Sequence, residues 1–348
     1  NNLNVQIDGA MWESLRDIKL DTEGEHMHAL RPMVKNVQHR IVFDVKLVDN
    51  IKIVTIRSSL VIENRTLLSV DVASIDPSGN MDGSVKKVAP GEDYAIPIEK
   101  AYTNRLCIRP DGKLNFFFST SSNILNTHTY THNNTIAGFG YRWTEKAFHW
   151  KDFASPAKPQ STFSCLAEDA DNNMPPFIFQ INARLDKKSI LFGQYPVMGI
   201  RLSAPIEIEN LLPFDFNFRI VDKTSGQDFS SYLRKGGITP IHVIENGHLV
   251  LLNVEMPDTD YKRSEYAIIS TKRTDDLDID HSIELVNRKD KSKLNIRINT
   301  LDIPDSGGAK KYSIFSPYII INKTGLPISF KEKPAWAEAL YSAGETVT

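Results

Sequence analysis

Residues 316–330, Ser-Pro-Tyr-Ile-Ile-Ile-Asn-Lys-Thr-Gly-Leu-Pro-Ile-Ser-Phe, form an apolar run that a single asparagine, Asn322, interrupts. Two earlier stretches align with this run without gaps: Leu60-Val-Ile-Glu-Asn64-Arg-Thr-Leu-Leu-Ser-Val and Ile206-Glu-Ile-Glu-Asn210-Leu-Leu-Pro-Phe-Asp-Phe. Each stretch carries its asparagine in the same slot. Self-similarity of this kind indicates that one structural unit is repeated along the chain.

The apolar residues around each asparagine lie at even spacings. They stand four and two positions before it (Leu60, Ile62; Ile206, Ile208; Tyr318, Ile320) and four and six positions after it (Leu68, Val70; Phe214, Phe216; Leu326, Ile328). Alternate residues of a strand share one face, so this spacing predicts that the asparagine lies on the buried face. A buried amide without partners costs about 1–3 kcal/mol, and the amide must therefore be hydrogen-bonded.

The residues after each asparagine, Arg-Thr, Leu-Leu-Pro and Lys-Thr-Gly, are typical of a turn. Asparagine bonds nearby backbone groups readily where a strand ends. We therefore predict a structural role for Asn64, Asn210 and Asn322, in which each pins a turn or a joint between units. Direct contact with a bound peptide is the alternative.

Alternating apolar patterns recur along the chain, as in 41–47, 177–185, 214–220 and 294–301, and turn sequences such as Asp-Pro-Ser-Gly separate them. This predicts an all-β fold of tandem, mostly antiparallel, β-sandwich-like repeat modules with few short helices. Helices are expected only near 11–18 and 333–341.

The repeats predict how the chain is divided. Residues 1–50 are expected to form the C-terminal part of one module, 51–195 and 196–311 two complete modules, and 312–348 the start of another. Asn64 and Asn210 are farther apart than Asn210 and Asn322. We assign the extra length to an aromatic-rich insertion near 121–160.

Composition excludes several classes of protein. The 348 residues are 41% hydrophobic and 24% charged, which is ordinary for a globular chain. Lysine and arginine (41) nearly balance aspartate and glutamate (43), so neither a nucleic-acid surface nor a polybasic membrane patch is indicated. The two cysteines, Cys107 and Cys165, lack the spacing of a disulfide framework or a zinc site, which favours a reducing, cytosolic setting. No apolar run is long enough to span a membrane and no secretory signal is expected, so any attachment to a membrane would be held by something else.

Catalytic and metal motifs are absent from the sequence. Neither a nucleophile elbow, a P-loop nor an H-E-x-x-H motif occurs. Gly138-Phe-Gly140 and the aspartates 276, 278 and 280 depart from nucleotide-binding and calcium-binding patterns, and His128 with His132 has no carboxylate or thiol nearby. The aromatic residues between 141 and 153 are expected to be core, with a peptide-stacking surface as the alternative. We therefore predict no enzyme activity, no catalytic residue, no cofactor and no metal.

The stretches around Asn210 and Asn322 resemble the region first catalogued as a SHORT-ROOT-binding domain in the vacuolar protein sorting 13 (chorein) family of lipid-transfer proteins. That region is now described as an adaptor-binding domain of six β-rich repeats, each with an invariant asparagine, and three such asparagines are present here. The resemblance covers essentially the whole chain and is strongest from about 200 to 330.

The resemblance implies a non-catalytic domain that binds short Pro-x-Pro peptides of organelle adaptor proteins. Such binding would recruit the remainder of a lipid-transfer protein to endosomal, vacuolar or mitochondrial contact sites. Contact with the membrane would then be indirect, peripheral and cytoplasmic, without nucleic acid. A purely architectural β-array without its own ligand is the alternative.

Overall fold

The computed structural model describes residues 2–112, 140–154, 161–168, 174–185, 195–257, 259–271 and 277–328. The chain divides into two compact units, Asn1–Phe315 and Ser316–Thr348, and each is considered separately. Nearly all regular structure in the described residues is β-strand, which confirms the predicted fold class. The described ranges contain two short helices, α1 (Ile98–Ala101) and α2 (Trp150–Ala154).

The helix expected near 11–18 was a wrong prediction. Residues Leu15–Lys19 form strand β2, which pairs antiparallel with β1 (Asn2–Val5). Asp17 has a φ of 57°, a left-handed conformation that an α-helix cannot continue through. The helix expected at 333–341 lies outside the described residues.

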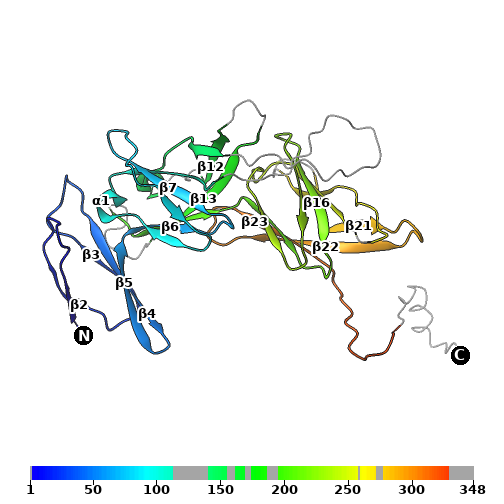
Figure 1. Cartoon of the computed structure of the whole chain (residues 1–348), viewed down its shortest axis with the longest axis horizontal. Helices are drawn as coiled ribbons and strands as arrows, with labels where there is room; N and C mark the ends of the chain where they lie inside the picture. Colours follow the sequence, from blue (N-terminus) through cyan, green and yellow to red (C-terminus); the bar gives the residue numbers. More distant parts are fainter. Residues whose placement is uncertain are drawn as a thin grey trace. The chain divides into compact units, whose positions relative to one another are not determined.

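Residues 60–203 form two facing sheets, which we call the first sandwich (Figure 1). One sheet has the order β11-β12-β13-β14-β6-β9 and comprises β6 (Leu60–Asn64), β9 (Asp93–Ala95), β11 (Tyr141–Thr144), β12 (Thr162–Ala167), β13 (Phe177–Leu185) and β14 (Met198–Ser203). The other has the order β10-β7-β8 and comprises β7 (Val70–Ile75), β8 (Lys86–Val88) and β10 (Arg105–Pro110). Both sheets contribute to one core, with Ile62, Val72 and Phe179 buried.

Residues 206–315 form the second sandwich (Figure 1). One sheet has the order β18-β15-β23-β22-β21 and comprises β15 (Ile206–Asn210), β18 (Ile238–Ile241), β21 (Ser282–Val286), β22 (Lys293–Asp302) and β23 (Lys310–Phe315). The other has the order β17-β16-β19-β20 and comprises β16 (Phe216–Asp222), β17 (Asp228–Leu233), β19 (Val250–Glu255) and β20 (Ala267–Ser270). Its core is separate from that of the first sandwich.

The first and last strands of each sandwich pair in parallel, whereas their other neighbours pair antiparallel. In the first sandwich β6 pairs with β14, and in the second β15 pairs with β23. The strand that precedes each asparagine strand therefore belongs to the preceding sheet. We propose module limits of 60–203 and 206–315 on this basis, which differ by four to ten residues from the limits that the sequence suggests.

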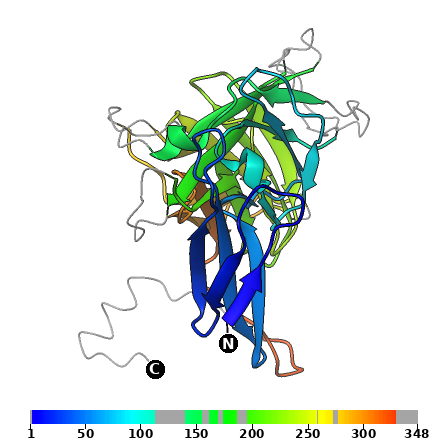
Figure 2. The same cartoon turned by 90° about the vertical axis from the view of Figure 1, so that its left-hand side faces the viewer.

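The N-terminal residues form a third, smaller assembly. Its main sheet is the three-stranded β3-β4-β5, drawn in blue in Figure 2, with strands β3 (Gly24–Ala29), β4 (Arg40–Val48) and β5 (Ile51–Ser58). Trp12, Ile18, Leu30 and Phe43 are buried in a core of its own. β5 directly precedes the asparagine strand β6. Like β14 and β23, it pairs antiparallel with the strand before it and therefore belongs to the preceding sheet.

The two sandwiches contact each other through β13 and loops of the second sandwich. The ring of His242 stacks on Phe177 with a centroid distance of 4.1 Å, and its Nδ1 lies 2.8 Å from the carbonyl oxygen of Ile178. Nearby, the Gln180 Nε2 donates to the carbonyl oxygen of Gly307 at 2.6 Å. These contacts join the sandwiches through buried polar and aromatic groups.

Candidate functional site: the repeated asparagine turns

Asn64 ends strand β6, and its side chain is completely buried. The Nδ2 group donates to the carbonyl oxygens of Leu68 (2.9 Å), Val88 (2.9 Å) and Ala89 (3.1 Å). The Oδ1 accepts from the backbone N–H of Thr66 at 3.0 Å and from its hydroxyl at 2.7 Å. The amide is therefore satisfied by the chain itself, as its burial requires.

Asn210 ends β15 and makes the same kind of contacts while being completely buried. Its Nδ2 donates to the carbonyl oxygens of Phe214 (2.9 Å) and Leu233 (3.1 Å), and its Oδ1 accepts from the N–H of Leu212 at 2.9 Å. Both asparagines thus bond a residue two positions on, a residue four positions on, and a strand that returns from far along the chain.

Asn322 lies in the second compact unit and is exposed in the described residues. Its Nδ2 donates to Leu326 O at 2.7 Å, and its Oδ1 accepts from the N–H of Thr324 at 3.0 Å and its hydroxyl at 2.8 Å. The local turn is the same as in the other two copies. Residues 329–348, which follow this turn, lie outside the described residues.

A glycine turn closes the backbone around each buried asparagine. The N–H of Gly91 donates to Asn64 O and the N–H of Gly236 to Asn210 O, both at 2.8 Å. Gly91 and Gly236 have φ values of +77° and +71°, which glycine adopts without a side-chain penalty. Gly91 and Gly236 are therefore structurally equivalent, 27 residues after Asn64 and 26 after Asn210.

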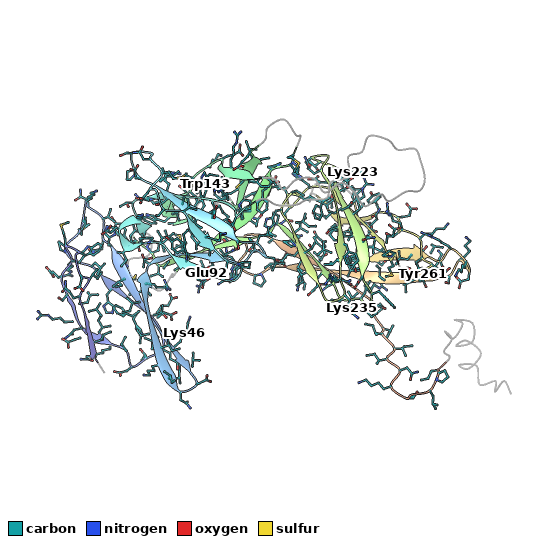
Figure 3. All side chains as sticks on the ribbon, viewed as in Figure 1. Lys46, Glu92, Trp143, Lys223, Lys235 and Tyr261 are labelled. Carbon is teal, nitrogen blue, oxygen red and sulfur yellow. The ribbon has the colours of Figure 1, made fainter. Side chains whose placement is uncertain are left out.

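A carboxylate braces the glycine turn next to Asn64. Glu92 Oε2 accepts from the N–H of Ala89 at 2.8 Å, and Figure 3 labels this residue. That hydrogen bond holds the pKa of the Glu92 carboxyl below its usual value. Ala89 is itself one of the acceptors of the Asn64 amide.

In the first two copies the flanking apolar residues lie on the predicted buried face except in the turn itself, and in the third copy Tyr318, Ile320, Leu326 and Ile328 are exposed. Before the asparagines, Ile62 and Ile208 are fully buried, as the alternation predicts. After Asn210 the strand pattern is broken by the turn, and Phe214 is 58% exposed. The pleat therefore does not continue through the turn, and burial resumes only at Val70 and Phe216.

Four of the five aromatic residues that the sequence places between 141 and 153 belong to the core of the first sandwich, and Trp143 does not. Tyr141, Phe148, Trp150 and Phe153 are buried there, and the guanidinium of Arg109 lies 4.6 Å from the ring centroid of Trp143, labelled in Figure 3. Of the expected insertion, residues 113–139 and 155–160 lie outside the described residues. Residues 140–154 instead form β11 and α2.

Sequence reasoning missed a second correspondence between the sandwiches. Residues 140–168 correspond to 260–288 without gaps: Tyr141 pairs with Ala167 as Tyr261 pairs with Asn287, and the Glu168 and Arg288 amides donate to the carbonyls of Gly140 and Asp260. The signal was present in Tyr141-Arg-Trp-Thr-Glu and Tyr261-Lys-Arg-Ser-Glu. Upstream of these residues, Ile108 corresponds to Val254. The N–H of Ile108 donates to the Thr144 hydroxyl, and the N–H of Val254 donates to the equivalent Ser264 hydroxyl. The extra length of the first sandwich therefore lies between 108 and 141.

The other candidates have structural explanations or are not described. Asp280 Oδ2 accepts from the N–H of Ile268 at 2.7 Å, which ties two segments of the second sandwich together. His128, His132, Gly138 and Asp276 lie outside the described residues. Within the described ranges, no group of three or more His, Cys, Asp or Glu side chains could hold a metal ion. No helix among those residues is long and apolar enough to cross a membrane.

Comparison with known proteins decides the family. A family model described as "Vacuolar-sorting associated protein 13, adaptor binding domain" matches residues 1–347. The chain belongs to the VPS13 adaptor-binding domain family. It is 34% identical over 348 residues to the intermembrane lipid transfer protein VPS13 of Chaetomium thermophilum, covering all of this chain and 10% of that protein.

More distant relatives show the same partial coverage. The intermembrane lipid transfer protein VPS13D of Homo sapiens is 24% identical over 302 residues, which is 86% of this chain and 6% of that protein. Vps13D of Drosophila melanogaster is 21% identical over 336 residues, which is 94% of this chain and 8% of that protein. The chain thus spans a tenth or less of the length of these relatives.

Proposed function

We propose that this chain recruits a bridge-like lipid-transfer protein to organelle membranes by binding short Pro-x-Pro peptides of membrane adaptors. The observation that carries the proposal is the match of the adaptor-binding family over residues 1–347. In this proposal the adaptors sit on endosomal, vacuolar or mitochondrial membranes at contact sites. The domain itself contributes binding and no catalytic step.

An all-β array suits such a ligand physically. An extended peptide alternates its side chains, so the two prolines project to one side, and they lack N–H groups that would need partners. Among the described strands, several sheet edges, including those of β9 and β18, carry no further strand. Because a short peptide buries little area and must be ordered, an affinity in the range of about 1–100 μM is expected.

The turn at Asn210 offers apolar residues to a proline-containing peptide. Leu211 and Phe214 lie in the Asn210 turn and are 48% and 58% exposed. Tyr232, which is also exposed, donates its hydroxyl to Asp215 beside that turn. Aromatic side chains are the usual partners of proline rings. We propose that Asn210 contributes indirectly, by holding this surface in shape, because its own amide is buried and fully engaged.

Recruitment to vesicles tests this function. Phosphatidylcholine vesicles that display a lipid-tethered Pro-Leu-Pro peptide are expected to co-sediment with the chain, whereas vesicles with an Ala-Leu-Ala peptide and bare vesicles are not. Phe214→Ala is expected to weaken recruitment, with Leu67→Ala, at the Asn64 turn, as the matched control. Equal sedimentation with all three kinds of vesicle would contradict adaptor recruitment and favour direct lipid binding, and no sedimentation with any would favour the architectural role.

A further inference from the structure

The outer edges of β12 and β21 differ, although the two strands are equivalent. In the first sandwich β11 pairs along β12, and the N–H of Glu145 donates to Ser164 O at 3.0 Å. In the second sandwich the pairing starts in the same way, with bonds from Arg288 N to Asp260 O (2.8 Å) and from Lys262 N to Val286 O (2.9 Å). The strand pairing ends at this point. Glu265 and Glu284, the residues equivalent to Glu145 and Ser164, form no backbone hydrogen bond with each other.

The residue change at this point explains why the strands separate. In the first sandwich the Ser164 hydroxyl donates to Glu145 Oε2 at 2.6 Å, which closes the pair. The equivalent residues of the second sandwich are two carboxylates, Glu265 and Glu284. Like charges opposite each other on neighbouring strands destabilise pairing. Glu284 is instead bonded to the Lys293 ammonium at 3.0 Å, on the other side of β21.

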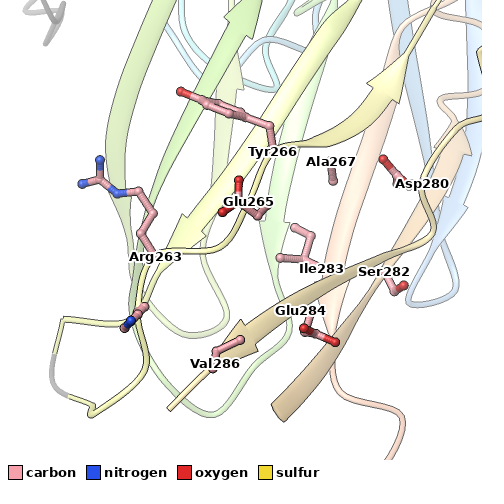
Figure 4. Close-up of a pocket in the computed structure, with 10 residues that line it drawn as sticks. Arg263, Glu265, Tyr266, Ala267, Asp280, Ser282, Ile283, Glu284 and Val286 are labelled. Carbon is pink, nitrogen blue, oxygen red and sulfur yellow. The ribbon is translucent and has the colours of Figure 1, made fainter. Parts of the chain in front are cut away.

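The separation leaves a groove of about 370 Å³ between β21 and the segment 262–267, shown in Figure 4. Its walls include Arg263, Glu265, Tyr266, Asp280, Ser282 and Glu284. Lys262 also lines the groove. Arg263 is ion-paired with Glu255 at 2.7 Å and Glu284 with Lys293 at 3.0 Å, and both of these partners lie outside the lining. The remaining lining charges are the carboxylates of Glu265 and Asp280 and the single ammonium of Lys262, so the groove keeps a net negative charge. The volume is at the lower end for ligand sites and suits a few extended residues.

Backbone groups on the floor of this groove face the opening. Along an antiparallel strand, the backbone N–H and C=O groups of alternate residues point to the same neighbouring strand. The bond from Ile298 N to His281 O shows that the backbone groups of His281, Ile283 and Leu285 point to β22. The N–H and C=O groups of Ser282 and Glu284 therefore point to the outer edge. In the described part of the chain they have no backbone partner there. In the first sandwich a strand occupies the equivalent edge.

We propose that this groove is a second peptide site, distinct from the adaptor function proposed above, which takes an extended segment with a lysine or arginine facing Glu265 and Glu284. The segment adds a short strand to β21. One of its residues exchanges backbone hydrogen bonds with Ser282 or Glu284, and its basic side chain adds a cation beside Glu265, opposite the Glu284 carboxylate that Lys293 already contacts.

Binding of a designed peptide to the whole chain tests the site. The probe is fluorescein-labelled Thr-Val-Lys-Val-Thr with blocked ends, followed by fluorescence anisotropy. Replacing its lysine by glutamate is expected to weaken binding at least tenfold, and methylating the backbone nitrogens is expected to abolish it. Hydrogen exchange at 282–286 is expected to slow when the lysine peptide is bound.

Variants of the chain separate this site from a general affinity for peptides. Glu284→Ser restores the hydroxyl of the first sandwich, and it is expected to close the groove and weaken the lysine peptide at least tenfold. Glu23→Ser, an equal change of charge at an exposed position, is expected to leave binding unchanged. The proposal is overturned by any of three results: no binding at about 1 mM peptide, equal binding of the N-methylated peptide, or wild-type binding by Glu284→Ser. Loss of Pro-x-Pro binding in Glu284→Ser would also overturn it, because the two sites would then be one.

Discussion

At the scale of single residues, the asparagine amide acts as a clamp between a turn and a returning strand. Five hydrogen bonds join the buried Asn64 side chain to its surroundings, and three of them are donated to carbonyl groups. Removing the amide takes this donor from the carbonyl of the buried Val88, and an unsatisfied buried group costs more than the bond itself contributes. Leu68 O keeps the Thr66 hydroxyl as a donor at 2.9 Å, and Ala89 is exposed.

Asn64→Ala is therefore expected to lower the free energy of unfolding of its sandwich by about 2–4 kcal/mol. Asn210→Ala is expected to have a similar or slightly smaller effect, because it breaks three bonds. Asn322→Ala is expected to destabilise least in this chain, since its described contacts stay within one exposed turn. The second sandwich contains no tryptophan, so denaturant unfolding is followed by far-ultraviolet circular dichroism, which reports strands of both sandwiches. A larger effect at Asn322 than at Asn64 would refute the clamp.

His242 makes the joint between the sandwiches sensitive to acid. Complete burial lowers the pKa of His242 to about 4, from about 6.5 when it is exposed. Between these values the unfolded chain binds the proton and the folded chain does not, so stability falls as pH decreases from about 6.5 to 4, by up to about 3 kcal/mol. His242→Phe is expected to reduce this part of the pH dependence, with exposed His281→Phe as the control. An unchanged pH profile in His242→Phe would contradict the assignment.

At the scale of elements, the close approach of a loop to β13 fixes how the two sandwiches meet. Gly307 has a φ of +78°, and a Cβ there would lie 2.7 Å from the carbonyl oxygen of Ile181. That atom is backbone and has little room to move. The loop also accepts the Gln180 side-chain hydrogen bond.

Gly307→Ala is therefore expected to destabilise the joint by about 2–4 kcal/mol through backbone strain and the clash together. Gly79→Ala is the matched control, because Gly79 has a φ of +89° with open space around it and should cost only about 1 kcal/mol. Limited proteolysis between the sandwiches and thermal unfolding both report the difference. Equal losses in the two variants would show that the approach to Ile181 contributes nothing.

The sequence predicts the elements that alternation governs and misses those set by long-range pairing. The strands around Asn64 and Asn210 and their buried amides follow from local spacing, because period two assigns each residue to a face. The parallel pairing of β6 with β14 does not, since it joins segments more than a hundred residues apart. The sequence comparison missed the equivalence of Tyr141 and Tyr261, because the first sandwich has extra residues between 108 and 141 and the distance from the asparagine to the tyrosine therefore differs between the two sandwiches. The groove beside Glu284 could not be predicted without that equivalence.

At the scale of the whole molecule, residues 60–315 form two similar sandwiches, and in each the strand that ends at the asparagine pairs with the last strand of its own unit. Separate cores allow each unit to fold around its own apolar residues. Such an array presents many sheet edges and turns, and membership of the adaptor-binding family gives those surfaces a proposed ligand.

The most direct measurement is a titration of the whole chain with a short fluorescein-labelled peptide that contains one Pro-Leu-Pro sequence, alongside its Ala-Leu-Ala control. Saturable binding of the proline peptide in the range of about 1–100 μM, at least tenfold tighter than the control, is predicted. Equal binding of the two peptides, or no binding of either, would contradict the claim that this chain recognises adaptors.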